Sequence, residues 1–166
     1  MNTYDPWPAY APDQILPRLF QGGTEDDHVI GEAIPADHYR GERRFDLVVT
    51  LYADAQPAPW GVEEIRFGFP DGHLNKSAIE RVLRIALTAH DRWLAGERVL
   101  IRCQAGVNRS GLVTAIVLML QGMSADEAIS LLRERRSPLV LNNPDFERFL
   151  REGIADHLDL STPLSA

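Results

Sequence analysis

Short apolar stretches along the chain predict strands. Such stretches cover residues 16–21, 45–51, 63–69 and 98–102. Residues 45–51 and 98–102 are rich in β-branched side chains and almost continuously apolar, which is typical of strands buried on both faces of a sheet. We expect the first of these strands to end in a turn formed by the glycine pair 22–23.

Other stretches show helical spacing of their apolar positions. Residues 77–94 place apolar side chains three and four positions apart, which predicts an amphipathic helix. Residues 112–120 are apolar almost all round, so a helix there must be buried centrally. Two further helices are predicted, one over 124–136, which opens with a Ser-x-x-Glu capping box, and one over 144–154.

Strands that alternate with helices indicate an α/β fold. We expect a single domain over residues 14–158, built on a central, mainly parallel sheet of four to five strands flanked by helices. Residues 1–13 contain three prolines and fit neither period, so we interpret them as an N-terminal arm. Residues 159–166 are interpreted as a C-terminal tail.

The composition narrows the class of protein. Of the 166 residues, 45% are hydrophobic and 25% are charged, close to the globular average, which excludes a mainly disordered chain, a collagen-like repeat and a coiled coil. The net charge of −7 argues against a general nucleic-acid or anionic-membrane surface. We expect neither a signal peptide nor a spanning helix, because no apolar run approaches the ~20 residues that cross a bilayer.

The cysteine and histidine content bears on compartment and cofactors. Cys103 is the single cysteine, so no internal disulfide can form, and an unpaired thiol fits a reducing cytoplasm. His28 and His38 follow acidic residues, yet no spacing of His, Cys and acidic residues matches a metal site. We therefore expect a cytoplasmic protein without metal or cofactor.

The segment from Cys103 to Ser110 carries the most specific chemistry, since it joins a predicted buried strand to the central helix. A tight loop there points backbone N–H groups inward at the positive end of the helix dipole, which makes an anion site. Arg109 offers a planar fork of donors for two phosphate oxygens. Cys103 in the same field is expected to react as a thiolate, and the Ser110 hydroxyl can donate to its sulfur. The residues expected to line the phosphate site between them are Gln104, Ala105, Gly106, Val107 and Asn108.

A thiolate and a guanidinium that face one tetrahedral anion predict nucleophilic attack on phosphorus. The alternative is that Cys103 is an ordinary small core residue, which is the commoner role of a lone cysteine. Glycine three positions later, arginine six later and serine seven later favour the phosphate site, because this combination is rare by chance.

The run 103–110 resembles the Cys-x5-Arg-Ser/Thr signature of the cysteine-based phosphatases. Its Ala-Gly pair and its serine are similar to the dual-specificity and tyrosine phosphatase branch. The resemblance covers about residues 14–158, with 15–23 similar to the opening strand of that branch. It implies a phosphotyrosine-phosphatase-like fold and a two-step reaction, in which Cys103 attacks the phosphoester and water then hydrolyses the phosphocysteine.

The family also needs a general acid on a separate loop, and Asp71 is the candidate. It follows the predicted strand 63–69, where the family carries its acid, although Pro-Asp-Gly is also an ordinary turn sequence. Asp91, on the polar side of the helix 77–94, is the alternative. The acid would protonate the leaving oxygen and later take a proton from the hydrolytic water.

Two supporting residues are implied by the resemblance. Asn143, with Phe146 and Leu150 after it, resembles the start of the family's closing helix, whose Asn helps to brace the phosphate loop. Arg102 departs from the family, which has His before the cysteine to hold the loop and keep the sulfur ionised. An arginine there would favour a thiolate, but it needs a partner of its own, because a buried unpaired charge is costly.

The end of the helix 124–136 is basic. We interpret its arginines through the helix dipole, with a second anion site as the alternative. They are Arg133, Arg135 and Arg136.

The uncharged interior of the loop favours phosphoproteins over inositol phosphates, which relatives often bind with lysines there. We predict a phosphatase for phosphotyrosine, with phosphoserine, phosphothreonine and small phosphomonoesters as further substrates. Three alternatives stay open. One is a phosphate-binding module without turnover, in which Arg102 has replaced the family's His. Another is an RNA 5′-phosphatase of the same superfamily, which residues 108–111 resemble but the acidic net charge and Asp71 disfavour. The third is a rhodanese-like sulfur carrier, which the six-residue step from Cys103 to Arg109 fits less well.

Overall fold

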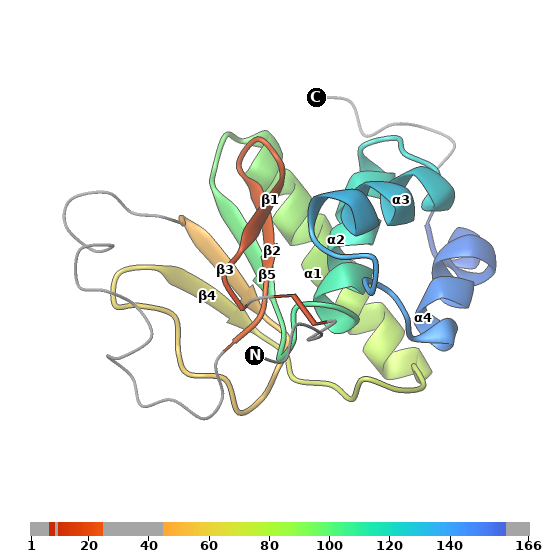
Figure 1. The fold of residues 1–166 in the computed structure, drawn as a ribbon, viewed down its shortest axis with the longest axis horizontal. Coiled ribbons are helices and arrows are strands. Elements are labelled where there is room, and N and C mark those ends of the chain that lie inside the picture. The colour runs from red at the N-terminus through yellow and green to blue at the C-terminus, as the bar shows by residue number, and fades with distance from the viewer. Residues whose placement is uncertain (1–6, 9, 25–44, 159–166) are drawn as a thin grey trace, which may run out of the picture.

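The structure is a computed structural model that describes residues 7, 8, 10–24 and 45–158 (Figure 1). His28, His38 and the predicted tail 159–166 lie outside these residues, as does most of the predicted arm. The five strands of the sheet are β1 (Asp13–Leu16), β2 (Leu19–Gly22), β3 (Leu47–Thr50), β4 (Glu63–Arg66) and β5 (Val99–Arg102).

The strands are ordered β1-β2-β5-β3-β4 across the sheet. β1 runs antiparallel to β2, and the pairs β2–β5, β5–β3 and β3–β4 are parallel. The predicted α/β fold with a mainly parallel sheet is therefore confirmed. β5, the strand that leads into the Cys103 loop, occupies the centre of the sheet, with a strand paired along each edge.

Helices gather on one side of the sheet (Figure 1). They are α1 (Lys76–Leu94), α2 (Arg109–Leu120), α3 (Ala125–Arg135) and α4 (Pro144–Arg148). α2 packs against β2 and β5, with α1 and α3 as its neighbours. The predicted helix over 144–154 keeps α-helical geometry only in α4, and continues as a π-helical turn and a short 3-10 turn to Asp156.

The core lies between the helices and the sheet, and α2 is its centre. Every α2 residue from Ser110 to Leu120 is buried, as its all-round apolar character predicts. Each fully buried leucine or isoleucine in such a helix stabilises the fold by about 1.5–3 kcal/mol. No helix in the described part of the chain is both long and apolar enough to cross a membrane.

The opposite face of the sheet carries a smaller apolar cluster of Phe20, Phe45, Val48 and Leu100. Side chains alternate between the two faces along each strand. Arg102, two positions after Leu100 on β5, therefore shares the face of the smaller cluster. Cys103, the next residue, belongs to the helix-side core.

The first strand differs from the prediction. Instead of one strand closed by Gly22 and Gly23, the chain forms a β1–β2 hairpin that turns at Pro17 and Arg18, with Arg18 at a φ of 67°. Gly22 lies within β2. At Gly23 a Cβ would lie only 2.9 Å from the carbonyl oxygen of Gln104. The second glycine thus allows the chain to pass close to the Cys103 loop rather than forming a turn.

Capping residues explain where the helices α1 and α3 begin. Asn75 caps α1, with its Oδ1 accepting a hydrogen bond from the Ala78 N–H at 2.8 Å. The predicted capping box of α3 is confirmed, because Ser124 Oγ accepts from the Glu127 N–H and the Glu127 carboxylate accepts from the Ser124 N–H. Both caps satisfy backbone donors that a helix N-terminus leaves unpaired.

Candidate active site

The loop 103–108 connects the centre of the sheet to the buried helix α2. Its starting point is fixed, because the helix-facing Val99 and Ile101 of β5 are completely buried. Asn108 stands at the N-cap of α2, yet its side chain makes no cap hydrogen bond. The first N–H groups of α2 therefore have no capping side chain from Asn108 and can donate to another acceptor, as they do in helix N-termini that bind anions.

Gly106 sets the curvature of the loop. Its φ of 69° lies in the left-handed region, where a side chain is strained. A Cβ at this position would also lie 2.4 Å from Arg136 Nη2 and 2.5 Å from the carbonyl carbon of Gly22. Only glycine fits between these two neighbours.

The sulfur of Cys103 lies at the base of this loop. Cys103 is 2% exposed, and its Sγ is 3.3 Å from Ser110 Oγ. When the sulfur is a thiolate, the Ser110 hydroxyl can donate a charge-assisted hydrogen bond to it. The structure thus brings together the predicted nucleophile and the predicted serine.

Arg109 begins α2 and is held from two sides. Its Nη1 donates to the carbonyl of Phe69 at 3.1 Å, and its Cζ lies 5.3 Å from the centre of the Tyr52 ring. Its Nε is buried without a hydrogen-bond partner among the described residues. A buried donor left unsatisfied costs about 1–3 kcal/mol, so this nitrogen calls for an acceptor that enters the site.

The predicted phosphate-lining residues differ in exposure. Gln104 is exposed, and its Oε1 lies 3.5 Å from Arg109 Nη2. Ala105 is half-buried, whereas Val107 is buried in the core. The rim of the loop is therefore formed by 104 and 105, and its base by 103 and 107.

Asp71, the predicted acid, follows β4 and contacts the loop directly. Asn108 Nδ2 donates to Asp71 Oδ2 at 2.9 Å, and Asn143 Nδ2 donates to Asp71 Oδ1 at 2.8 Å. Each carboxylate oxygen therefore accepts one amide hydrogen bond. The alternative acid, Asp91, lies on α1 with its side chain 75% exposed and its Oδ1 3.8 Å from His90 Nδ1.

Asn143 connects the start of α4 to both loops. Its Oδ1 caps α4 by accepting from the Asp145 and Phe146 N–H groups. Its own N–H donates to Asn108 Oδ1 at 3.0 Å, and its side-chain amide reaches Asp71. The contact with the phosphate loop that the resemblance implies for this Asn is made here by the main chain.

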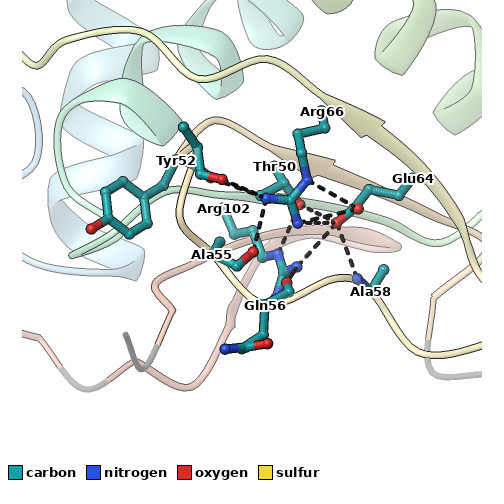
Figure 2. A network of polar contacts seen from close by, with 9 residues as sticks. Thr50, Tyr52, Ala55, Gln56, Ala58, Glu64, Arg66 and Arg102 are labelled. Carbon is teal, nitrogen blue, oxygen red and sulfur yellow. Dashed lines mark hydrogen bonds and ion pairs between the residues drawn. The ribbon is translucent and has the colours of Figure 1, made fainter. Parts of the chain in front are cut away.

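Arg102 lies in a polar network on the sheet face opposite the helices (Figure 2). Its Nε donates to Thr50 Oγ1 at 3.0 Å, and its Nη2 donates to the Gln56 carbonyl at 2.7 Å and to Glu64 Oε2 at 3.1 Å. The expectation that Arg102 replaces the family's His and favours a Cys103 thiolate does not match this placement. The alternation of a strand turns its guanidinium toward Glu64, which supplies the partner that a buried charge requires.

The same network holds the loop 52–58 that follows β3 (Figure 2). Arg66 Nη1 donates to the carbonyls of Ala53 and Ala55, and Glu64 Oε2 accepts from the Ala58 N–H. Tyr52, at the start of this loop, is the residue whose ring faces Arg109. The network therefore fixes one wall of the site from the far side of the sheet.

Glu64 supplies an acidic side chain to that network, and its Oε2 accepts from Thr50 Oγ1 at 2.7 Å. Burial raises the pKa of Glu64, but the hydrogen bond from Thr50 and the positive charges of Arg66 and Arg102 lower it more. The net result is a pKa below the ordinary value, so Glu64 is a carboxylate at neutral pH.

Arg136 is a site residue that the sequence analysis did not identify. Its fully buried side chain donates to the Gly106 carbonyl at 2.6 Å, to the Ala105 carbonyl at 3.2 Å and to Asp13 Oδ2 at 2.8 Å. Burial lowers the pKa of Arg136, while the negative charge of Asp13 and the hydrogen bond with it oppose that change. Arg136, rather than Arg102, thus contacts the loop that follows Cys103.

A sequence signal for Arg136 does exist. Ala128 and Leu132 are buried on α3, and Arg136 stands four positions after Leu132 on the same stripe. An arginine on a buried stripe needs a specific set of partners, which the helix dipole does not supply. Its interpretation as a dipole residue is therefore wrong.

The arrangement brings a sulfur, a guanidinium and a carboxylate to the loop that joins β5 to α2. The sulfur and the guanidinium come from the two ends of the loop 103–109, and the carboxylate comes from the loop after β4. Such a set can bind a tetrahedral anion, attack it and exchange a proton with it. Among the described residues, no group of three His, Cys, Asp or Glu side chains is placed to hold a metal ion.

Part of the chain matches a known protein family. The model of the dual specificity phosphatase catalytic domain matches residues 75–153. This segment contains Cys103, Arg109 and Asn143, but it begins after Asp71. No curated protein matches the chain in sequence.

Solved structures extend the comparison to most of the chain. Tk-PTP in its active form is 25% identical, with 89% of this chain and 97% of that chain covered at a TM-score of 0.66. Human DUSP28 is 22% identical, with 92% and 99% covered at a TM-score of 0.70. A putative dual specificity phosphatase from mouse is 20% identical, with 94% and 93% covered at a TM-score of 0.68. The last two likenesses show a shared fold.

Proposed function

We propose that the chain is a phosphatase of the dual-specificity branch of the cysteine-based phosphatase superfamily, as the match of residues 75–153 supports, and that it hydrolyses phosphomonoesters with Cys103 as the nucleophile. The observation that supports this most is the buried Nε of Arg109, which lacks a partner among the described residues. A phosphate oxygen bound in the loop that Cys103 and Arg109 enclose would satisfy it.

In the first step, the electron pair of the Cys103 thiolate forms the S–P bond while the P–O bond to the leaving group breaks. Arg109 and the loop N–H groups bind the three remaining phosphoryl oxygens. Asp71 gives its proton to the leaving oxygen. A protonated carboxyl can keep both amide hydrogen bonds, from Asn108 and Asn143, while its O–H donates.

In the second step, water attacks phosphorus and gives a proton to the Asp71 carboxylate. The P–S bond breaks, and its electron pair returns to sulfur. The Ser110 hydroxyl, 3.3 Å from that sulfur, donates to the departing thiolate. Inorganic phosphate leaves, and Asp71 is protonated for the next cycle.

Phosphotyrosine is the proposed substrate. The residues between Cys103 and Arg109 carry no charge, so the loop itself offers no site for a second phosphate group. The Tyr52 ring next to Arg109 and the Tyr10 ring next to the loop add aromatic surface near the rim. Such surface suits an aryl phosphate through stacking, which is worth about 0.5–1.5 kcal/mol per pair.

Hydrolysis of p-nitrophenyl phosphate and of a phosphotyrosine peptide by the purified chain tests this proposal, with vanadate as a competing tetrahedral anion. We expect vanadate-sensitive turnover in the parent chain. Cys103→Ser should abolish turnover and retain phosphate binding, because Arg109 and the backbone donors remain. Vanadate binding without turnover in the parent would instead indicate a phosphate-binding module, and normal turnover in Cys103→Ser would exclude the mechanism.

A further inference from the structure

Gln21 is a buried polar residue that the proposed reaction does not explain. It lies on β2, is completely buried and faces the helices, as Leu19 does two positions earlier. Its Oε1 has no hydrogen-bond partner among the described residues. A buried amide with an unsatisfied oxygen costs stability, so an apolar side chain here would be the more stable choice.

The amide nitrogen of Gln21 is fully used. Nε2 donates to the Gly106 carbonyl and to Ser110 Oγ, each at 3.1 Å. The Gly106 carbonyl can only accept a hydrogen bond, so the side-chain amide of Gln21 must present its nitrogen to Gly106 and not its oxygen. Gln21 thus contacts the phosphate loop and the serine beside the sulfur with the same NH₂ group.

The Ser110 hydroxyl has few hydrogen-bond acceptors other than the Cys103 sulfur. A serine in a helix often donates to the carbonyl four or three positions earlier, which here belong to Gly106 and Val107. The Gly106 carbonyl already accepts from Gln21 and from Arg136, and the Val107 carbonyl accepts from the Leu141 N–H at 3.3 Å. Since Gln21 also donates to Ser110 Oγ, the remaining acceptor within reach is the sulfur.

We propose that Gln21 is a positioning residue, which acts through Ser110 by directing its hydroxyl proton onto the Cys103 sulfur. The inference rests on the proposed function and deepens it. The hydrogen bond from Ser110 favours the thiolate in the free protein, and it stabilises sulfur as the leaving group when the P–S bond of the phosphocysteine breaks. Without the amide of Gln21, the Gly106 carbonyl loses one of its donors. The Ser110 hydroxyl can then donate to this carbonyl instead of to the sulfur.

The rate of Cys103 alkylation by iodoacetamide between pH 5 and 9 tests the inference. Cys103 is the single cysteine, so the reaction reports on this sulfur alone. Gln21→Leu and Gln21→Met remove both donors and keep an apolar volume in the core. We expect alkylation at pH 6 to slow by about three- to tenfold in each, the range for losing part of a hydrogen bond to a charged group. In single turnover, hydrolysis of the phosphoenzyme should slow more than its formation.

A double-mutant cycle separates this role from a merely structural one. In a Ser110→Ala background, Gln21→Met should change alkylation by less than about twofold, because the group it acts through is gone. Leu19→Val, on the same strand and face, is the matched control and should keep the parent pH profile. Gln21→Met keeps the length of the side chain, so it provides the measurement if Gln21→Leu fails to fold.

Two results would overturn the inference. One is an unchanged alkylation profile in Gln21→Met. The other is an effect of Gln21→Met that persists in full without the Ser110 hydroxyl. Alkylation needs no turnover, so a parent chain that failed to hydrolyse any phosphomonoester would refute the proposed function and leave the role of Gln21 still to be decided by this comparison.

Discussion

The carboxylate of Asp71 and the amide of Asn108 are hydrogen-bonded side chain to side chain, at 2.9 Å, across 37 positions of the sequence. The bond ties the loop after β4 to the loop after β5. The candidate acid is therefore held at the phosphate loop by a residue of that loop itself, and Asn143 holds the second carboxylate oxygen.

Asp71→Asn should slow the reaction in proportion to how much the leaving group needs a proton. General acid catalysis is worth about 10²–10⁴-fold, and a p-nitrophenolate needs less of it than a tyrosine phenolate. We therefore expect a large loss on a phosphotyrosine peptide and a small loss on p-nitrophenyl phosphate. Single-turnover rates between pH 5 and 8 measure this. Asp91→Asn is the control, and an equal effect of Asp71→Asn on both substrates would refute the assignment.

Arg109→Lys should weaken the transition state while keeping the positive charge. Lysine lacks the planar fork and the Nε that now has no partner among the described residues. Removing one preorganised donor costs about 2–4 kcal/mol, so kcat/KM should fall by roughly 30-fold to 10³-fold. Steady-state kinetics give the ratio. A variant with nearly parental kcat/KM would show that this side chain does not hold the phosphoryl group.

Arg102→Ala should leave the sulfur unaffected. Its guanidinium contacts Thr50, Gln56 and Glu64 on the opposite face of the sheet. We expect the pH dependence of Cys103 alkylation to match that of the parent chain, whereas the loop 52–58 should become more susceptible to proteolysis. A shift of the alkylation profile would restore the histidine-like role inferred from sequence.

Arg136→Met should destabilise the fold and disturb the loop together. It leaves the Ala105 and Gly106 carbonyls without their guanidinium donors and Asp13 without its ion pair. Breaking a buried ion pair costs about 3–5 kcal/mol, and the partial exposure of Asp13 reduces the expected loss to about 2–3 kcal/mol. Urea unfolding measures it. Arg135→Met, at the exposed neighbouring position, is the matched control and should change stability by less than about 0.5 kcal/mol.

Glu64 makes the stability of the fold sensitive to acid. Its folded-state pKa lies below the ordinary value of 4.5, so its contribution is complete above that value and is lost as the pH falls through the folded pKa. We expect the urea midpoint of the parent to drop between pH 5 and 3. Glu64→Gln should lower the midpoint at pH 6 and reduce the drop on acidification. Parallel pH curves for the two proteins would contradict this role.

The features that depend on residues close together in the sequence were predicted correctly. The spacing from Cys103 to Ser110 identified the loop, because Gly106 and the start of α2 shape it locally. The all-round apolar character of α2 and the capping box at Ser124 depend on patterns within a single helix, and both are confirmed.

The contacts that required the folded chain were missed. Gln21 and Arg136 reach the Gly106 carbonyl from β2 and from the end of α3. The spacing along α3 indicates that Arg136 is buried, but it does not indicate which carbonyl Arg136 reaches. The placement of Arg102 could have been predicted, since strand alternation puts it and Cys103 on opposite faces. The turn at Arg18 could not, because a non-glycine residue at positive φ carries no clear sequence signal.

The attachment of Arg136 to the Cys103 loop and to a segment near the N-terminus sets an order in which the site can be completed. While the protein is being synthesised, Cys103 and Arg109 emerge before Arg136, and the carbonyls of the loop lack their guanidinium until α3 has formed. The other anchor lies at Ala11 and Asp13, ahead of the predicted domain start at residue 14. A chain shortened to begin at residue 14 would retain Cys103, Arg109 and Asp71. It would lack Asp13, so the buried guanidinium of Arg136 would face the loop without its counter-ion.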